Sequence, residues 1–262
     1  QRKKMTEATE NLEPEDEKVM TWVGHLTEAR NRLLKVFVFF IAAFLCVYPF
    51  SGEVLKYLML PLAQAMKTAG GAERAIFTGV AEGFIVHLKV SAFSAAVVSF
   101  PFMAFQAWRF IAPALYPSEQ GFVKPLFFVS PLLFAAGACF VFYLIAPPAF
   151  KFLLSFQQLE KDALPVVLEA RIAEYLSFMM TLILAFGASF QLPIVLVVLA
   201  KLGLITAQTL VAGRRYAIVL IFIVAAVLTP PDVISQFALA CPLIILYESA
   251  ILSIRALEKK QK

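Results

Sequence analysis

Residues 25–50 read HLTEARNRLLKVFVFFIAAFLCVYPF, and this stretch decides the fold. It opens with one carboxylate, Glu28, close to the cations Arg30, Arg32 and Lys35. After Lys35 the chain has no charged residue before Glu53. An uninterrupted apolar run of this length is typical of a helix that crosses a bilayer. The stretch therefore predicts a charged collar at a water–lipid boundary, followed by a transmembrane helix.

The composition extends this interpretation to the whole chain. Of 262 residues, 61% are hydrophobic and only 16% are charged, and the mean hydropathy is +0.81. A soluble domain carries more charge, about 25%. The 15 prolines are compatible with membrane helices, because neighbouring helices satisfy the carbonyl groups that proline leaves unpaired. The composition excludes a soluble globular domain and indicates a polytopic membrane protein.

Apolar runs recur along the sequence at Leu33–Phe50, Gly83–Ala107, Pro125–Pro148 and Glu174–Leu199, with two weaker runs at Tyr216–Thr229 and Val233–Leu252. Six spans place both termini on one side of the membrane. If that side is the cytoplasm, sixteen Lys and Arg residues lie on it and six on the other, as the positive-inside rule requires. We therefore expect an all-α membrane protein with both termini cytoplasmic: a charged tail (1–21), a six-helix transmembrane domain (22–255) and a basic tail (256–262).

The last two spans are expected to be short. The run Tyr216–Thr229 would cover about 21 Å as a helix, against a hydrocarbon core of about 30 Å. The turn after it contains Pro230 and Pro231, which cannot continue a helix. Four further prolines fall within the other long runs and are expected to kink them: Pro101, Pro131, Pro193 and Pro242. These features predict a kinked, open-sided, concave bundle with short fifth and sixth helices.

Other residues exclude several classes of function. The chain has two histidines, His25 and His87, and contains neither a Gly-x-Ser-x-Gly nor a His-Glu-x-x-His motif, so we expect no enzyme. Three cysteines lie within apolar runs in no metal-like spacing, and we expect no metal or cofactor. Residues 1–20 hold no apolar core of a secretory signal peptide, and the acidic run Glu13–Glu17 predicts a solvated tail.

Two cytoplasmic carboxylates are candidate site residues. Glu28 has Arg32 four residues later, the favourable order for a helix ion pair worth about 0.2–0.5 kcal/mol. It is alternatively half of a site for a cationic ligand. Glu119 is the one acid in the loop 108–121 between the second and third spans, where it is either a solvated carboxylate or the other half.

Polar residues within the spans are also candidates, because an ionisable group in lipid is costly and usually functional. Gln191 precedes Pro193 and is expected to hydrogen-bond between helices or to line a groove. Glu248 lies about 28 Å along its helix from Thr229, which places it near the inner headgroups, where it can pair with Arg255. A small-solute or proton-coupled transporter that uses Glu248 and Gln191 is therefore an alternative function.

Four separated motifs carry a family resemblance. They read His-Leu-Thr-Glu-Ala-Arg-Asn-Arg-Leu at 25–33, Phe-Ile-Ala-Pro-Ala-Leu-Tyr-x-x-Glu at 110–119, Ser-Phe-x-x-Pro at 189–193 and Leu-Thr-Pro-Pro-Asp-Val-x-Ser-Gln at 228–236. In this order the chain resembles the TatC family, the multispanning receptors of the twin-arginine protein translocase. Two positions depart from the family pattern: Gln191 stands where many relatives have Glu, and Ala29 where Leu is usual.

The resemblance implies a function. Family members bind twin-arginine signal peptides of folded proteins at the cytoplasmic face of the bacterial inner membrane, with the carboxylates that match Glu28 and Glu119 nearest the paired arginines. Arg30, Pro113 and Leu115 belong to the same expected site. The single-span proteins TatA and TatB are expected partners along the fifth and sixth helices, and export is driven by the proton-motive force; self-association is expected, and nucleic-acid binding is not. Matching polar positions are Gln191, Thr229, Asp232, Gln236 and Glu248.

Overall fold

The computed structural model describes residues 22–69, 74–114, 117–157, 169–228 and 233–261. Its longer helices are α2 (Trp22–Val47), α5 (Glu82–Ile111), α6 (Pro117–Phe140), α8 (Ile172–Ser189), α10 (Ala207–Leu228) and α11 (Val233–Gln261). Shorter elements are η1 (Tyr48–Phe50), α3 (Ser51–Leu58), α4 (Leu60–Ala69), η2 (Ala112–Ala114), η3 (Val141–Ile145), α7 (Ala146–Leu154) and α9 (Leu192–Lys201). Two short strands, β1 (Ala75–Ile76) and β2 (Ala170–Arg171), pair in parallel.

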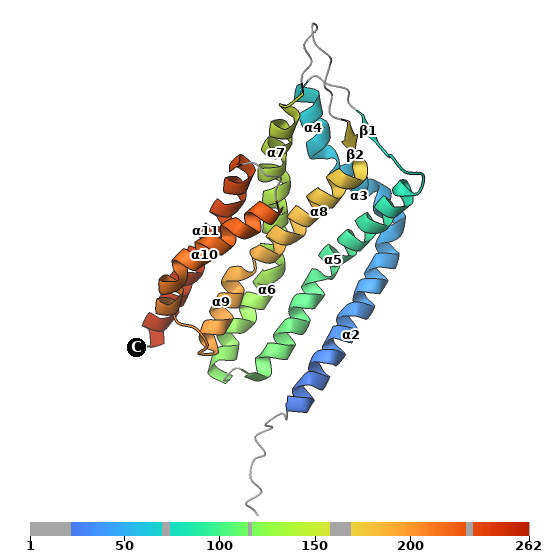
Figure 1. Ribbon diagram of the computed structural model, residues 1–262. Coiled ribbons are helices and arrows are strands. Elements are labelled where there is room, and N and C mark those ends of the chain that lie inside the picture. Colours follow the sequence, from blue (N-terminus) through green and yellow to red (C-terminus); the bar gives the residue numbers. More distant parts are fainter. Residues whose placement is uncertain (1–21, 70–73, 115–116, 158–168, 229–232, 262) are drawn as a thin grey trace, which may run out of the picture.

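Six helical segments of the described chain are long and apolar enough to cross a membrane, which confirms the predicted fold class. They cover Leu26–Thr68, Glu82–Ile111, Lys124–Leu154, Ile172–Lys201, Ala207–Leu228 and Gln236–Lys259. The start of α2 and the end of α11 lie at the same end of the molecule (Figure 1). This arrangement agrees with an even number of spans.

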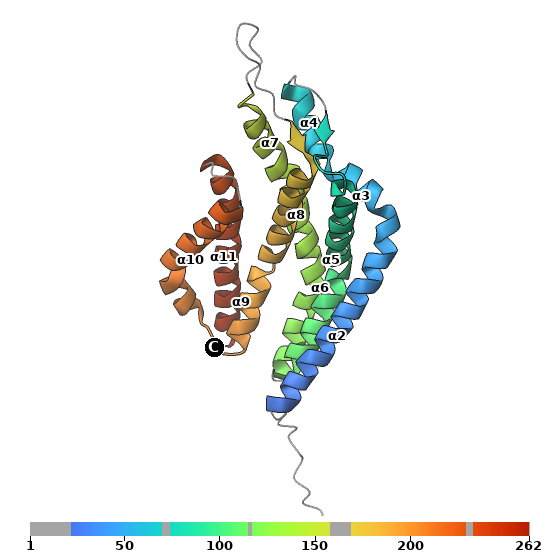
Figure 2. The ribbon, with the colours of Figure 1, turned by 45° about the vertical axis from the view of Figure 1, so that its right-hand side comes forward.

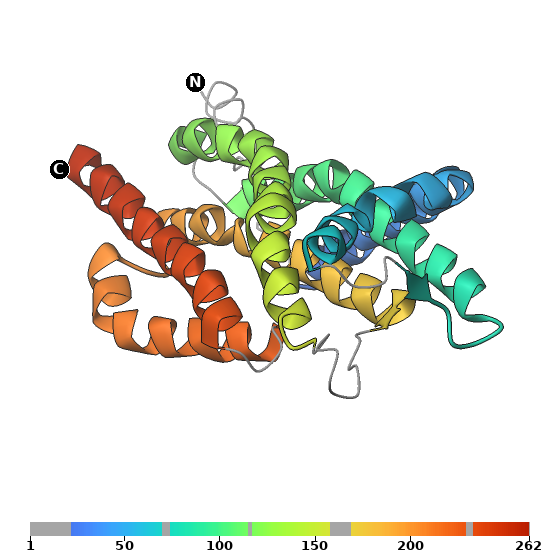
Figure 3. The same cartoon turned by 90° about the horizontal axis from the view of Figure 1, so that it is seen from above.

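The helices are splayed and tilted rather than closed around a pore (Figures 1 and 2). At one edge α2 packs along α5, and at the other α10 packs along α11. Between these pairs, α6 packs on both α5 and α8, and α9 packs on α11. Seen from above, α2 and α5 lie on one side of α6 and α7, and α10 and α11 on the other (Figure 3). The arrangement agrees with the open-sided bundle that the sequence predicts.

The helices α6 and α8 pack closely against each other, and this contact depends on two glycines. A Cβ atom on Gly187 would lie 2.6 Å from the ring of Phe134. One on Gly137 would lie 2.8 Å from the carbonyl oxygen of Phe186 and 2.9 Å from the ring of Phe190. Small residues of this kind let two membrane helices approach until aromatic rings fill the space between them. This crossing fixes the centre of the bundle.

The fifth helix is longer than its apolar run. It begins at Ala207 rather than near Tyr216, so the estimate of 14 residues is wrong; α10 has 22. The apolar run begins only after Arg214 and Arg215, but the helix already includes both residues, because Arg is a good helix former. At 22 and 24 residues the fifth and sixth candidate spans are nevertheless the shortest of the six in the described chain.

The four prolines that are expected to kink the helices occupy two kinds of position. Pro193 lies just after the break between α8 and α9, whereas Pro101, Pro131 and Pro242 lie inside unbroken helices. The third span instead changes to a π-helical turn at Val141–Ile145, immediately before the Pro147–Pro148 pair that opens α7. In a π-helical turn the backbone hydrogen bonds join residues five apart instead of four. No pattern in the sequence predicted this turn.

Polar contacts close the end of the molecule opposite the start of α2. The Glu82 carboxylate accepts hydrogen bonds from the backbone N–H of Gly79 (2.9 Å) and the hydroxyl of Thr78 (3.0 Å). Arg171 in β2 donates to the same Thr78 hydroxyl at 2.8 Å, which ties the start of α8 to the turn before α5. These bonds hold the β1–β2 pair against the tops of two spans (Figure 1).

Candidate functional site

The ion pair that the collar sequence predicts is present. Glu28 and Arg32 lie one turn apart on α2, and the Arg32 Nε donates to Glu28 Oε1 at 2.9 Å. The Arg32 Nη2 donates to the same oxygen. The side chains are only 18% and 16% exposed, so water screens this pair less than a surface pair. The helix-pair interpretation of Glu28 is therefore confirmed, but it uses only one of the two carboxylate oxygens.

The Arg32 guanidinium also reaches the neighbouring helix. Its Nη1 donates to the Oε1 of Gln106 in α5 at 3.3 Å. Gln106 is 6% exposed, so this amide fixes the guanidinium from inside the α2–α5 contact. Gln106 was not among the predicted site residues. The signal that could have identified it is a polar amide near the end of an otherwise apolar span.

The second oxygen of Glu28 is buried and has no hydrogen-bond partner among the described residues. A buried carboxylate oxygen without a donor carries a desolvation cost of about 1–3 kcal/mol or more. The Arg32 guanidinium holds the carboxylate by its other oxygen, so Oε2 is fixed in position. It is therefore a fixed acceptor that no donor of the described residues uses.

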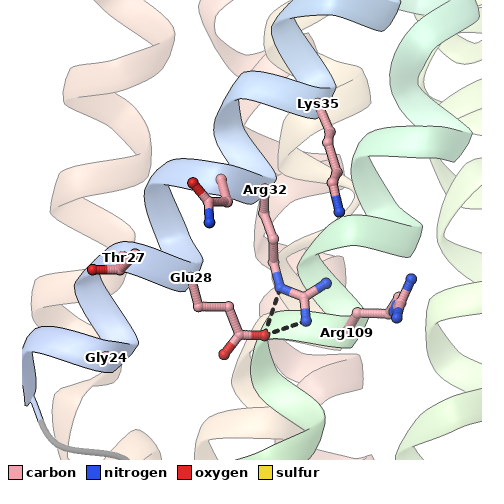
Figure 4. Close-up of a pocket in the computed structure, with 7 residues that line it drawn as sticks. Gly24, Thr27, Glu28, Arg32, Lys35 and Arg109 are labelled. Atoms are coloured by element: carbon pink, nitrogen blue, oxygen red, sulfur yellow. Dashed lines mark hydrogen bonds and ion pairs between the residues drawn. The ribbon is translucent and has the colours of Figure 1, made fainter.

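Glu28 and Arg32 line a cavity of about 340 Å³ at the start of α2 (Figure 4). The lining residues are Gly24, Thr27, Glu28, Asn31, Arg32, Lys35 and Arg109. Arg109 comes from the last turn of α5, and its guanidinium lies 5.8 Å from the centre of the Phe105 ring. Among its described lining residues the cavity thus combines one carboxylate with three cations. Its excess of positive charge is the one that the collar sequence indicated, with Arg109 of α5 in place of Arg30.

The other residues expected at this site are described to different extents. Arg30 is exposed, donates weakly to Asn31 at 3.5 Å and does not line the cavity. Pro113 is exposed in η2, which follows α5 directly. Glu119 lies in the first turn of α6, at the end of the molecule where α2 begins, but its side chain lies outside the described residues, as does the whole of Leu115. The distance between Glu28 and Glu119 therefore stays a prediction.

Gln191 hydrogen-bonds between helices, as the sequence predicts. Its Oε1 accepts from the Ser130 hydroxyl of α6 at 2.6 Å. Its Nε2 donates to the carbonyl oxygens of Ser130 (3.1 Å) and of Gly187 (3.4 Å). The amide thus occupies the break between α8 and α9 and uses both donor and acceptor groups there. An ionised carboxylate could make neither of the two donor contacts, and a protonated carboxyl group could make only one.

A ladder of polar contacts ties α10 to α11. Glu248 accepts from the Arg214 Nη2 at 2.6 Å, so the pairing with Arg255 that the sequence suggested is wrong. Because α10 begins at Ala207, it includes Arg214 and brings it opposite Glu248. A helix that began at Tyr216, as the sequence predicted, would not include Arg214. Tyr247 donates to the carbonyl of Leu210 at 2.8 Å, and Gln236 donates to the carbonyl of Phe222 at 3.1 Å. Thr229 and Asp232 lie outside the described residues.

The outer face of α10 is apolar and exposed. Its most exposed large side chains are Tyr216, Val219, Leu220, Ile223 and Val227, between 55% and 81% exposed. In a membrane this face meets lipid or another helix. Together with the polar ladder behind it, the face forms a narrow two-helix edge of the bundle.

Comparison with known proteins identifies the relatives of this chain. A sequence profile described as Sec-independent protein translocase protein (TatC) matches residues 24–242. The Sec-independent protein translocase protein TatC of Rickettsia prowazekii (strain Madrid E) is 44% identical over 236 residues, covering 90% of this chain and 92% of the relative. The protein of the same name from Escherichia coli (strain K12) is 37% identical over 231 residues, covering 87% and 86%.

Solved structures match the fold over a similar length. A crystal structure of the twin arginine translocase receptor TatC superposes with a TM-score of 0.74 at 34% identity, covering 87% of this chain and 96% of that one. A second crystal structure of the receptor, in DDM, gives a TM-score of 0.77 at 34% identity, covering 88% and 99%. The similarity therefore extends over nearly all the helices described above.

Proposed function

Because this chain belongs to the TatC family of Sec-independent protein translocase proteins, we propose that it binds twin-arginine signal peptides of folded proteins and is the core scaffold of their translocase. The family consists of transport components, and we assign the chain no enzymatic activity. The observation that carries the proposal is the buried, unpartnered Oε2 of Glu28 in a cavity at the start of α2. Arg32 holds the carboxylate through Oε1, and Oε2 is available as a hydrogen-bond acceptor.

The chemistry of the ligand follows from that oxygen. A guanidinium group presents several N–H donors in a planar fork, and charge-assisted bonds to a carboxylate contribute about 1.5–3 kcal/mol each. One arginine of the peptide would bind Oε2 of Glu28, and the second would bind Glu119 in the first turn of α6. Arg32 would stay on Oε1 as a positioning residue. Lysine lacks the fork, so a Lys-Lys peptide would bind more weakly.

Recruitment of TatA- and TatB-type single-span partners belongs to the α10–α11 edge. The exposed apolar face of α10 suits a membrane helix. The polar contacts that include Gln236 and Glu248 keep the two helices together as one docking surface. Thr229 and Asp232, which follow α10 and precede α11 in the sequence, are assigned to the same surface. Gln191 maintains the break between α8 and α9. Self-association of the receptor within the complex is part of the same proposal.

The membrane setting is proposed on charge. The start of α2 and the end of α11 lie at one end of the molecule. The sequence assigns sixteen Lys and Arg residues to that side against six on the other, as expected for the cytoplasmic side of a bacterial inner membrane. The proton-motive force would supply the energy for export. A transporter based on Gln191 and Glu248 is not favoured, because both side chains are engaged in contacts between helices.

The test is cross-linking of a radiolabelled twin-arginine signal peptide to the receptor in membranes, with insertion and abundance of each variant measured in parallel. Glu119→Ala and Glu28→Lys should each reduce cross-linking at least tenfold, and Glu28→Gln should reduce it less than Glu28→Lys. Glu53→Gln is the matched control, since Glu53 forms an exposed ion pair with Lys56 outside the cavity. Unchanged cross-linking in Glu28→Lys and Glu119→Ala would disprove the proposed site.

A further inference from the structure

The cavity beside Glu28 holds more positive charge than the described residues neutralise. Arg32, Lys35 and Arg109 line it together with a single carboxylate, which leaves an excess of two positive charges. If Glu119 also faces the cavity, three cations still oppose two carboxylates. Within the described part of the chain, neither Lys35 nor Arg109 forms an ion pair. A cationic peptide would meet repulsion on its approach to this surface.

A source of negative charge lies just before α2 in the sequence. The segment Glu13-Pro14-Glu15-Asp16-Glu17 carries four carboxylates in five residues. It is joined by residues 18–21 to Trp22, where α2 begins, and Gly24, two residues later, already lines the cavity. The acidic segment and the cationic cavity are therefore neighbours along the chain.

The linker is long enough for the two to meet. Lys35 lies 13 residues beyond Trp22, about 20 Å along the helix. The nine residues 13–21 span up to about 30 Å when extended. All three cations of the cavity are within reach if this segment turns back along α2. Tethering also gives the carboxylates a high effective concentration at the cavity, in the millimolar range for short flexible linkers.

We propose that the acidic segment Glu13–Glu17 docks on the cation-lined cavity and pairs with Lys35 and Arg109. Four carboxylates and Lys18, added to an excess of two positive charges, leave the combined surface with a net charge of −1. An anionic phospholipid headgroup could use the same cations, but each headgroup brings one phosphate and is not tethered. Docking is independent of the proposed function. Its consequence, faster capture of a cationic signal peptide by a surface that has become negative, rests on the proposed function.

Zero-length carbodiimide cross-linking of the full chain tests the docking directly, because it joins a carboxylate to a lysine only at ion-pair distance. In nanodiscs at about 20 mM salt, peptide mapping should find Glu13–Glu17 joined to Lys35, with a yield that falls severalfold at about 500 mM salt. Lys201 at the end of α9 is the comparison lysine. The variant Lys35→Arg keeps the charge and should abolish the cross-link.

Two results would overturn the docking. One is a cross-link to Lys35 no more abundant than that to Lys201 at low salt. The other is a cross-link that forms in phosphatidylcholine nanodiscs and disappears in phosphatidylglycerol-rich ones, which would assign the cavity to lipid headgroups.

The consequence has its own test in association kinetics. Neutralising the segment (Glu13→Gln, Glu15→Gln, Asp16→Asn and Glu17→Gln together) should slow association of a twin-arginine peptide about threefold to tenfold at low salt, with dissociation unchanged. Unchanged association would disprove this role. If the peptide does not bind the unaltered chain, the proposed function fails, while the cross-linking result still decides the docking.

Discussion

Two helix contacts of this bundle are built in opposite ways. The α6–α8 crossing is completed by glycines and aromatic rings, with no space for even a methyl group at Gly187. The α2–α5 contact is apolar along its length, where Phe39 stacks on Phe102 at 4.5 Å, but at the start of α2 it becomes a chain of polar groups from Gln106 through Arg32 to Glu28. That chain ends in Glu28 Oε2, which has no partner among the described residues. Close packing fixes the scaffold, whereas the incomplete polar chain is where we propose that the ligand binds.

The largest expected effect is at the packed crossing. In Gly187→Ala the new methyl group would lie 2.6 Å from the Phe134 ring, so the helices must separate or the ring must move. Overpacking of this kind costs about 1–3 kcal/mol, and thermal unfolding of the detergent-solubilised protein should show a clear loss. The matched control is Gly213→Ala in α10, where the nearest atom would be 3.9 Å away.

The control should be neutral or slightly stabilising, because Ala forms helix better than Gly. Equal stability of the two alanine variants would mean that the α6–α8 crossing is looser than its glycines indicate. The two contacts would then not differ in the way described above.

A smaller effect is expected where a polar group lies inside the packed region. Gln191→Leu leaves the Ser130 hydroxyl and two carbonyl oxygens without the amide that joins them. Hydrogen bonds between membrane helices average about 0.6 kcal/mol, so the loss should be about 1–2 kcal/mol. A double-mutant cycle with Ser130→Ala, followed by thermal unfolding, measures the part that belongs to the pair. Strictly additive losses would show that the two side chains do not support each other.

The sequence predicted the features that depend on nearby residues. The Glu28–Arg32 pair follows from a spacing of four on a helix, and the first four spans follow from the length of an apolar run. The bond from Gln191 to another helix was predicted because an amide in lipid needs a partner. In each case the residue type and its near neighbours in the sequence were enough for the prediction.

Contacts between residues that are far apart in the sequence could not be predicted in this way. Gln106 lies 74 residues from Arg32, and Arg214 lies 34 residues from Glu248. Hydropathy also underestimated α10, because it measures how apolar a run is and not how far the backbone stays helical. Pairing across helices depends on where each helix begins, which an apolar run does not give.

The smallest effect is expected at Gln106, and it should appear in ligand binding rather than in stability. Gln106→Leu removes the acceptor that orients the Arg32 guanidinium, while the Arg32 bonds to Glu28 remain. The less restrained pair should weaken twin-arginine peptide binding about twofold to fivefold, with little change in thermal unfolding, because the contact at 3.3 Å is long for a strong hydrogen bond. Gln106→Glu, which keeps an acceptor, should retain peptide binding. If Gln106→Leu instead lowers stability as much as Gly187→Ala, the polar end of the α2–α5 contact is part of the scaffold, and Glu28 is positioned by packing rather than by this chain of hydrogen bonds.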